Sequence, residues 1–585
     1  MRSKKYLALL LVVMLVSILA VGCGSDDTPN TDEPATNGNE EKEEGEKQEG
    51  EEVDGTSSAT FGLDEEQYLT FVLDAEPSTL DPSKGADNYS NTILLNVMEP
   101  LLRLEEDSDN NTAIAAAGAE SWEANEDGTV WTFKIRDNTW SDGVKVRAQD
   151  YEYGIKRSLD PDTASPYSWI IGDIKNASKV NSGELPVDEL GVKALDDETL
   201  EITLENPTPY FEQLTYNRTM LPQRQDIVEA QGDKFGTEIE TVVFNGPFTL
   251  STWVHNSELI LTKNESYWNA EEVLMETVNL KIIQDENARL NSLTNGEIDG
   301  SATNRPEWRE QFMANEDMVH YEVVNPTTFF MFFNTQDEVF SNANIRKAFS
   351  AAVDREELAN VIFDGIHTPA YGWVPPTMNI GDDEYRSLVD GPVEKLVKEE
   401  DPVELLQKGL EELGMDTDPS KLTVTISLGG TDQWFRTYGE YLQQVFNTKL
   451  GVDFQVQQME WPVFDSNVNK GDFQIGYMSW GADYNDPSNM LNLFRSDAGA
   501  IGTGWVNERY DELIDLAGKE MDVAKRLEYF REAEGILLYE DAAVAPIVFP
   551  RSNIFRYEYV HNLGINPFST QGYKNAYTWF REPAN

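Results

Sequence analysis

The chain has 585 residues, of which 40% are hydrophobic and 11% aromatic, and these values are ordinary for a globular protein of two or three domains. Its formal net charge is −60, which argues against a role in binding nucleic acid or in electrostatic adhesion to anionic lipid, because both need a basic surface. Acidic residues occur along the whole chain, so the charge belongs to the folded body as well as to the amino-terminal region.

The first 23 residues have the pattern of a bacterial export signal that ends at a lipid attachment site. Arg2, Lys4 and Lys5 form a basic start, and an apolar run over residues 6–21 follows. This run is shorter than the roughly 20 residues that span a bilayer. It ends in Ala20-Val-Gly-Cys23, which resembles a lipobox, although the leucine stands one position earlier than usual.

We therefore expect residues 1–22 to be removed as a signal peptide and Cys23 to carry a lipid. Two acyl groups on diacylglycerol and an amide-linked chain would hold the protein at the extracytoplasmic face of the cell membrane. The alternative is a plain secretory peptide followed by an incidental cysteine. Cys23 is the only cysteine in the chain, so no intrachain disulfide can form.

Residues 23–60 are predicted to be a flexible acidic tether. They are rich in Gly, Ser, Thr, Asn, Asp and Glu and contain almost no large apolar side chains. Such a segment cannot bury enough surface to offset the entropy lost on ordering, and its like charges favour an extended chain.

Strand and helix patterns alternate along the rest of the chain and predict an α/β fold. The predicted strands are 67–73, a hairpin over 121–135 with Asp127-Gly128 as its turn, 199–204 and 422–428; the predicted helices are 345–353 and 438–450, the second closed by Gly451. No repeat of 20–50 residues is found, so a solenoid is not expected.

A series of short motifs, in a fixed order, resembles the oligopeptide- and dipeptide-binding family of extracytoplasmic solute-binding proteins of ABC importers. The motifs are Glu76-Pro-Ser-Thr-Leu-Asp-Pro82, Glu99-Pro-Leu-Leu102, Trp122, Trp140-Ser-Asp-Gly143, Ala148-Gln-Asp150, Asn245-Gly-Pro-Phe248, Tyr267-Trp-Asn269, Asn334-Thr335, Ile345-Arg-Lys-Ala348, Asp354-Arg355 and Trp480-Gly-Ala-Asp-Tyr-Asn-Asp-Pro487. Each motif is weak alone, but their order and spacing cover almost the whole body.

The resemblance implies a periplasmic-binding-protein-like fold with two lobes that close on a ligand by a hinge, plus an extra inserted lobe. Lobe I would be discontinuous and consist of residues 61–100, 230–335 and 550–585. Lobe II would be an insertion over 101–229, and lobe III would cover 336–549.

The resemblance also implies that Asp483 pairs with the α-amino group of a peptide, because a buried ammonium needs a carboxylate partner. The alternative is that Asp483 caps a turn or a helix. Asp486 and Pro487, however, already form a good N-cap and first-turn pair for a helix that starts near Ser488. Asn485 in the same segment is a further candidate ligand-binding residue.

Trp461, Trp480 and Tyr167 match aromatic residues that line the pocket in the family, where flat rings cover side chains of many shapes. For each of them the alternative is a core aromatic residue. Six positions before Asp483, short-peptide members tend to carry a basic residue for the peptide carboxylate, but Tyr477 stands there. Either the carboxylate is held elsewhere, with Arg551 as one substitute, or longer peptides are accepted. Arg551 is as readily explained by a structural role.

No local metal or catalytic motif is found. The four histidines, His255, His320, His367 and His561, are far apart in sequence, and no nucleophile elbow or phosphate loop occurs. The segment Asp107-Ser-Asp-Asn-Asn111 begins like a calcium loop but lacks the required glycine and glutamate, so a hairpin turn is expected.

These features predict a lipid-anchored receptor that binds oligopeptides and delivers them to the permease of an ABC transporter. We expect a monomer that is not an enzyme and that uses no cofactor or metal. The alternatives are the same fold with another solute, such as nickel, a glycan or a signalling peptide, and a secreted hydrolase with an acidic surface.

Overall fold

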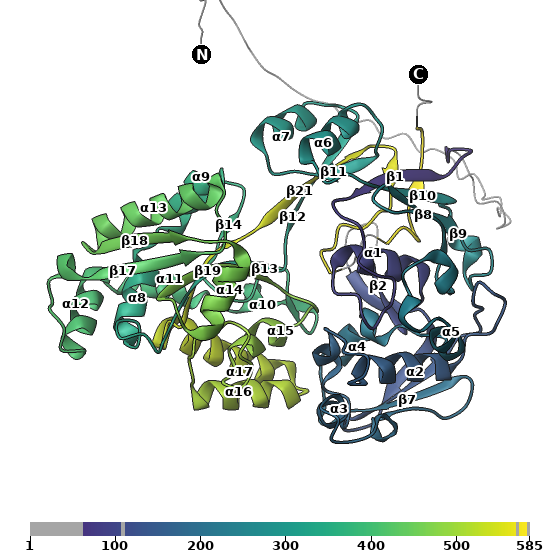
Figure 1. Cartoon of the computed structure of the whole chain (residues 1–585), viewed down its shortest axis with the longest axis horizontal. Coiled ribbons are helices and arrows are strands. Elements are labelled where there is room, and N and C mark those ends of the chain that lie inside the picture. The colour runs from purple at the N-terminus through teal and green to yellow at the C-terminus, as the bar shows by residue number, and fades with distance from the viewer. Residues whose placement is uncertain (1–61, 107–111, 569–571, 582–585) are drawn as a thin grey trace, which may run out of the picture. The chain divides into compact units, whose positions relative to one another are not determined.

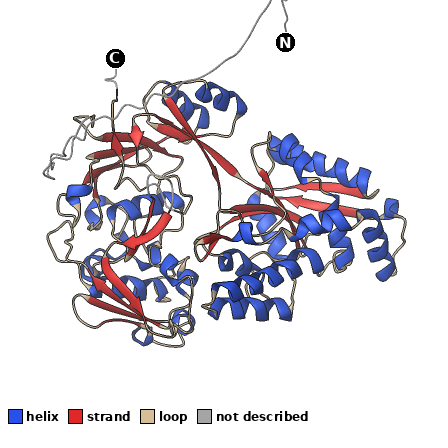
Figure 2. Ribbon diagram, turned by 180° about the vertical axis from the view of Figure 1, so that it is seen from behind, coloured by secondary structure: helices blue, strands red, loops and turns tan. Residues whose placement is uncertain are grey.

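The computed structural model describes residues 62–106, 112–568 and 572–581, all of which belong to one compact unit that starts at Thr60. The predicted signal peptide, Cys23, the predicted tether and the predicted turn at residues 107–111 lie outside the described residues. Helices and strands occur together along the described chain, which confirms the predicted α/β class (Figure 2). None of its helices combines the length and the apolar character needed to cross a membrane.

The first sheet has four strands in the order β1-β10-β9-β8, and the predicted strand 67–73 is its edge strand β1. The strands are β1 (Tyr68–Leu73), β10 (Thr277–Ile282), β9 (Glu258–Lys263) and β8 (Phe248–Val254). β1 runs parallel to β10, and the other pairs are antiparallel. Alternate residues Leu69, Phe71 and Leu73 are buried in a core that α1 (Asn88–Val97) completes.

The second sheet, in the segment predicted as an insertion, has the order β4-β5-β7-β6. Its strands are β4 (Ala119–Ala124), β5 (Val130–Ile135), β7 (Thr199–Thr203) and β6 (Val192–Ala194), and α2 (Ala148–Leu159) packs with them in one core. β4 and β5 form the predicted hairpin, with Gly128 at φ 72°, a conformation that glycine adopts without strain. Nearby, β2 (Leu102–Glu106) pairs antiparallel with β3 (Thr112–Ala116).

The third sheet has six strands in the order β14-β20-β13-β19-β17-β18. They are β14 (Thr368–Pro369), β20 (Val544–Phe549), β13 (Thr327–Phe333), β19 (Ile475–Gly481), β17 (Thr423–Leu428) and β18 (Asp453–Gln458). The predicted helices are present as α8 (Ala343–Ala352) and α13 (Gln433–Lys449), and both pack into the same core. α13 begins five residues earlier than predicted, because Asp432 caps its first turn.

Two chain segments continue from this sheet into a small sheet of the order β11-β21-β12 (Figure 1). β12 (Met318–Val324) leads into β13, and β20 leads into β21 (Arg551–Tyr557), while β11 (Gly300–Ala302) pairs with β21. The boundary of lobe I expected at residue 335 stays a prediction. Residues 327–333 pair with β19 and β20 of the six-stranded sheet, because the strand crosses between sheets at 325–326.

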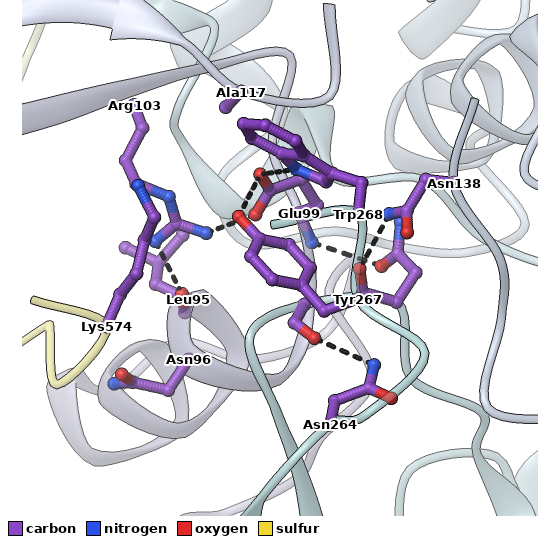
Figure 3. Close-up of polar contacts among 12 residues, drawn as sticks. Leu95, Asn96, Glu99, Arg103, Ala117, Asn138, Asn264, Tyr267, Trp268 and Lys574 are labelled. Atoms are coloured by element: carbon purple, nitrogen blue, oxygen red, sulfur yellow. Dashed lines mark hydrogen bonds and ion pairs between the residues drawn. The ribbon is translucent and has the colours of Figure 1, made fainter. Parts of the chain in front are cut away.

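A buried polar network around Glu99 joins the segment after α1 to a distant loop (Figure 3). Glu99 is fully buried, and its carboxylate accepts hydrogen bonds from the Tyr267 hydroxyl at 2.7 Å and the Trp268 indole at 3.0 Å. The Arg103 guanidinium pairs with the same carboxylate at 2.5 Å. The Tyr151 hydroxyl of α2 donates to the Glu99 carbonyl oxygen at 3.0 Å, so the network also connects the core of the second sheet to the segment after α1.

Candidate functional site

The segment that follows β19 carries two carboxylates with different surroundings. Asp486 caps α15 (Pro487–Leu491) by accepting from the Ser488 N–H at 2.9 Å, as predicted. Its carboxylate also pairs with the Arg526 guanidinium at 2.6 Å, and both side chains are buried. Asp486 is therefore fully engaged in structural contacts, which leaves Asp483 as the carboxylate available for another role.

Asp483 is partly buried, and the structure places no cation within ion-pair distance of it among the described residues. Its backbone N–H donates to the Asn489 side-chain oxygen at 3.2 Å, which holds the turn in place. Burial raises the pKa of the Asp483 carboxyl to about 6, and the nearby Arg218 guanidinium and the Asn489 amide oppose that shift. A carboxylate in this condition can bind a cationic group of a ligand.

Tyr167 and Arg218 lie within electrostatic range of Asp483, although all three are far apart in sequence. The Arg218 guanidinium carbon lies 4.4 Å from the centre of the Tyr167 ring. Burial raises the pKa of the Tyr167 hydroxyl, and the charge of Asp483 contributes to that rise. Tyr167 also stacks on Trp169, with ring centres 6.1 Å apart. The tertiary structure thus brings the predicted residues Tyr167 and Asp483 together and adds a cation that the sequence had not indicated.

A cavity of about 630 Å³ lies beside β19, and six aromatic side chains contribute to its walls; we call it the aromatic cavity. Its lining includes Phe329, Phe363, Trp434, Phe435, Trp461 and Tyr477. Trp461 is the first residue of α14 (Trp461–Lys470) and is 52% exposed. Gly429 leaves room for this ring, because a Cβ atom there would lie 2.8 Å from it.

Tyr477 contributes only its ring to this cavity. The side chain is 5% exposed, and its hydroxyl oxygen is inaccessible and has no hydrogen-bond partner within the described part of the chain. The ring centre lies 4.3 Å from that of Tyr438, and burial raises the pKa of the Tyr477 hydroxyl. The Tyr477 hydroxyl therefore cannot bind the peptide carboxylate in place of the basic residue that short-peptide members carry at this position.

The basic residues near the cavity are mostly neutral or already paired. Burial, with a contribution from Arg551, lowers the pKa of His367 to about 4, so this lining residue is neutral at neutral pH. Arg551 pairs with Glu322 and donates to the Thr368 hydroxyl at 2.8 Å, which supports a structural role. Arg305 also lines the cavity, and its guanidinium pairs with Glu307 at 2.5 Å and donates to the Asn287 side-chain oxygen at 2.7 Å.

Trp480 and Asn485 lie on either side of Asp483 but do not line the aromatic cavity. Trp480 is partly buried against the core, and its indole N–H lacks a partner among the described residues. Asn485 is 8% exposed and accepts a hydrogen bond from the Asn379 N–H at 2.8 Å. This contact gives Asn485 a structural function, and its assignment to ligand binding stays a prediction.

Sequence reasoning missed Arg218 and most of the cavity wall. The pair Trp434-Phe435 directly follows the helix cap Asp432, and two aromatic residues at a helix start could have drawn attention. Arg218 lies in a short 3₁₀ turn and has no distinguishing pattern around it. Within the described ranges, no group of three or more His, Cys, Asp or Glu side chains is placed to hold a metal ion.

The sequence and the fold of the chain are similar to those of known proteins. Residues 113–502 match the family model described as "Bacterial extracellular solute-binding proteins, family 5 Middle". The "Oligopeptide-binding protein OppA" of Bacillus subtilis is 33% identical over 487 residues, which cover 82% of this chain and 87% of that protein.

Two solved structures with bound peptide are also similar. "Listeria monocytogenes OppA bound to peptide" is 30% identical with a TM-score of 0.70, over 88% of this chain and 99% of that one. The complex of Haemophilus influenzae OppA with the peptide RPPGFSPFR is 26% identical with a TM-score of 0.72, over 88% of this chain and 100% of that one. The chain belongs to the bacterial extracellular solute-binding proteins of family 5.

Proposed function

We propose that this protein is an extracytoplasmic receptor that binds oligopeptides and delivers them to the permease of an ABC transporter. The observation that carries the proposal is the partly buried Asp483, which lacks an ion-pair partner among the described residues and is available for a peptide ammonium group. The aromatic cavity supports it, because flat rings accept apolar side chains of different shapes. Relatives named as oligopeptide-binding proteins support it as well.

In this proposal the peptide ammonium pairs with Asp483, and a side chain further along the peptide occupies the aromatic cavity. Extended backbone of the protein pairs with the peptide backbone, which adds affinity with little dependence on peptide sequence. Because the Tyr477 hydroxyl is turned into the protein, the peptide carboxylate is not held at that position. Peptides of variable length therefore fit this site better than dipeptides do.

The two crossing segments, β12 to β13 and β20 to β21, provide a hinge for closure on the peptide. Only a few residues, 325–326 and Pro550, separate the strands of each pair, so small backbone rotations there would move whole sheets. Attachment of a lipid at Cys23 would keep the receptor at the membrane beside the permease, and residues 24–60 would act as its tether. Binding and release without chemical change of the peptide complete the proposed cycle.

The first test is mass spectrometry of molecules that leave the purified protein on acid denaturation. A mixture of peptides would support the proposal and give their length range. A single non-peptide species would keep the family and replace the solute. Peptides that become shorter on incubation with the protein would favour the alternative of a hydrolase.

A second test addresses the lipid. Metabolic labelling with a fatty acid analogue should mark the wild-type protein and leave a Cys23→Ala variant unmarked. Labelling of both proteins, or of neither, would contradict attachment at Cys23.

A further inference from the structure

Arg218 is a buried cation without an ion-pair partner in the described part of the chain. It is 5% exposed, and none of the ion pairs among those residues includes it. One guanidinium nitrogen, Nη1, donates to the Asp87 carbonyl oxygen at 2.8 Å, while Nε has no partner within the described residues. Burial without a carboxylate partner is costly for a guanidinium, so the position calls for an explanation.

Two carboxylates lie in the neighbourhood of Arg218, and neither neutralises it by direct contact. The Asp87 carboxylate accepts from the Ser90 N–H at 2.7 Å, where it caps α1, and from the Ser78 hydroxyl at 2.5 Å. Asp483 acts on Arg218 only through longer-range electrostatic attraction. The site therefore presents a negative and a positive group that attract each other without direct contact, both partly or fully removed from water.

The orientation of the Arg218 side chain is well defined by its surroundings. The guanidinium stacks on the ring of Tyr167, a candidate residue of the same site, and its Nη1 donates to the Asp87 carbonyl oxygen at 2.8 Å. A guanidinium that is held in this way loses little conformational freedom when it binds a planar anion. Its remaining N–H groups match the geometry of a carboxylate.

A peptide ammonium bound to Asp483 lies within the field of Arg218 and is repelled by it. A peptide that brings a carboxylate beside its ammonium group removes this repulsion and supplies the missing partner. We propose that Arg218 binds a carboxylate on one of the first two side chains of the peptide, so that the receptor selects peptides with an acidic amino-terminal end. This inference rests on the proposed function and adds a specificity that the function does not require.

Because the whole protein is strongly acidic, a preference for acidic peptides would indicate a local cation in the site. With a formal net charge of −60, the overall field disfavours acidic ligands. A protein without a local anion site would therefore bind the more acidic of two otherwise equal peptides less tightly. Tighter binding of an acidic peptide must come from a local cation, and salt of about 0.15 M reduces the opposing long-range term.

The test is a glutamate scan in alanine-based five-residue peptides, measured by calorimetry on the full-length protein after its bound molecules are removed. Each peptide with Glu at position 1, 2 or 3 is compared with its Gln counterpart, so size and shape are matched. We expect the Glu peptide to bind about tenfold to a hundredfold more tightly at position 1 or 2, as for a charge-assisted hydrogen-bonded pair. At position 3 the two peptides should bind alike.

Two variants of Arg218 complete the test. Arg218→Met keeps the apolar stem and should abolish the difference in affinity between Glu and Gln peptides. Arg218→Lys keeps the charge without the planar fork and should retain part of the preference, which a purely structural role of Arg218 would not explain. If Arg218→Met does not fold, the glutamate scan in the wild type and in Arg218→Lys tests the role of Arg218.

Equal binding of Glu and Gln peptides by the wild type would overturn the inference and leave the proposed function standing. A preference that persists in Arg218→Met would also overturn it, because another cation would then be responsible. Absence of binding for every peptide would contradict the proposed function itself, and the inference would fall with it.

Discussion

Replacement of Asp483 by asparagine tests the proposed ammonium site most directly. The substitution keeps the size of the side chain and removes only its charge, so the turn held by Asn489 should persist. Because the pKa of Asp483 is about 6, the carboxyl is mostly ionised at neutral pH in the wild type. The bound peptide ammonium would therefore lose a full charge partner in the variant.

The expected loss follows from the burial of the pair. Removing one partner of a buried charge pair costs about 2–5 kcal/mol, mostly because the other charge stays buried alone. This corresponds to a dissociation constant raised roughly 30-fold to 4,000-fold. Arg218 increases the loss, since its positive charge acts on the same ammonium once Asp483 is neutral.

The assay is isothermal titration calorimetry with a peptide and its N-acetylated form. Wild-type protein should prefer the free amine strongly, and Asp483→Asn should bind the two forms alike. A matched control is Asp465→Asn, which removes one charge from an exposed position on α14 in the same part of the chain and should leave affinity unchanged. If Asp483→Asn still discriminates between the two forms as the wild type does, the assignment of Asp483 is wrong.

Three other predictions follow from the same geometry. Affinity for free-amino peptides should fall about tenfold between about pH 7 and pH 5, because Asp483, with its pKa of about 6, must lose a proton to bind the ammonium. In the same series of titrations, the affinity for N-acetylated peptides should not change in this way. Trp461→Ala should weaken the binding of peptides with aromatic side chains by about 1 kcal/mol or more, roughly fivefold. The midpoint of thermal unfolding should change little, since the ring is 52% exposed, and a large fall in that midpoint would indicate a core role instead. Glu99→Gln should lower the free energy of unfolding by about 3–5 kcal/mol in urea titrations, because Arg103 loses its buried partner. Substitution of the exposed Glu120 by Gln should leave that free energy unchanged. Equal stability of both variants would contradict the interpretation of the Glu99 network.

Much of the secondary structure follows from local pattern alone. Residues 68–73 alternate between the core and the outside, and Asp127-Gly128 places a glycine where the hairpin turns with positive φ. The cap at Asp486 with Pro487 was also predictable, because capping depends on a few neighbouring residues. The start of α13 was missed, since its first turn carries aromatic residues that serve the cavity rather than the helix stripe.

The sequence by itself therefore determined the class of fold and the family resemblance, and it proposed candidate site residues, among which Asp483 is the most informative. Only the tertiary structure decided which residues meet. It placed Tyr167 and Arg218 within electrostatic range of Asp483, buried the Tyr477 hydroxyl and assigned strand 327–333 to the six-stranded sheet. The physical reason is that burial, charge and register depend on contacts between segments far apart in the chain, and no local pattern records them.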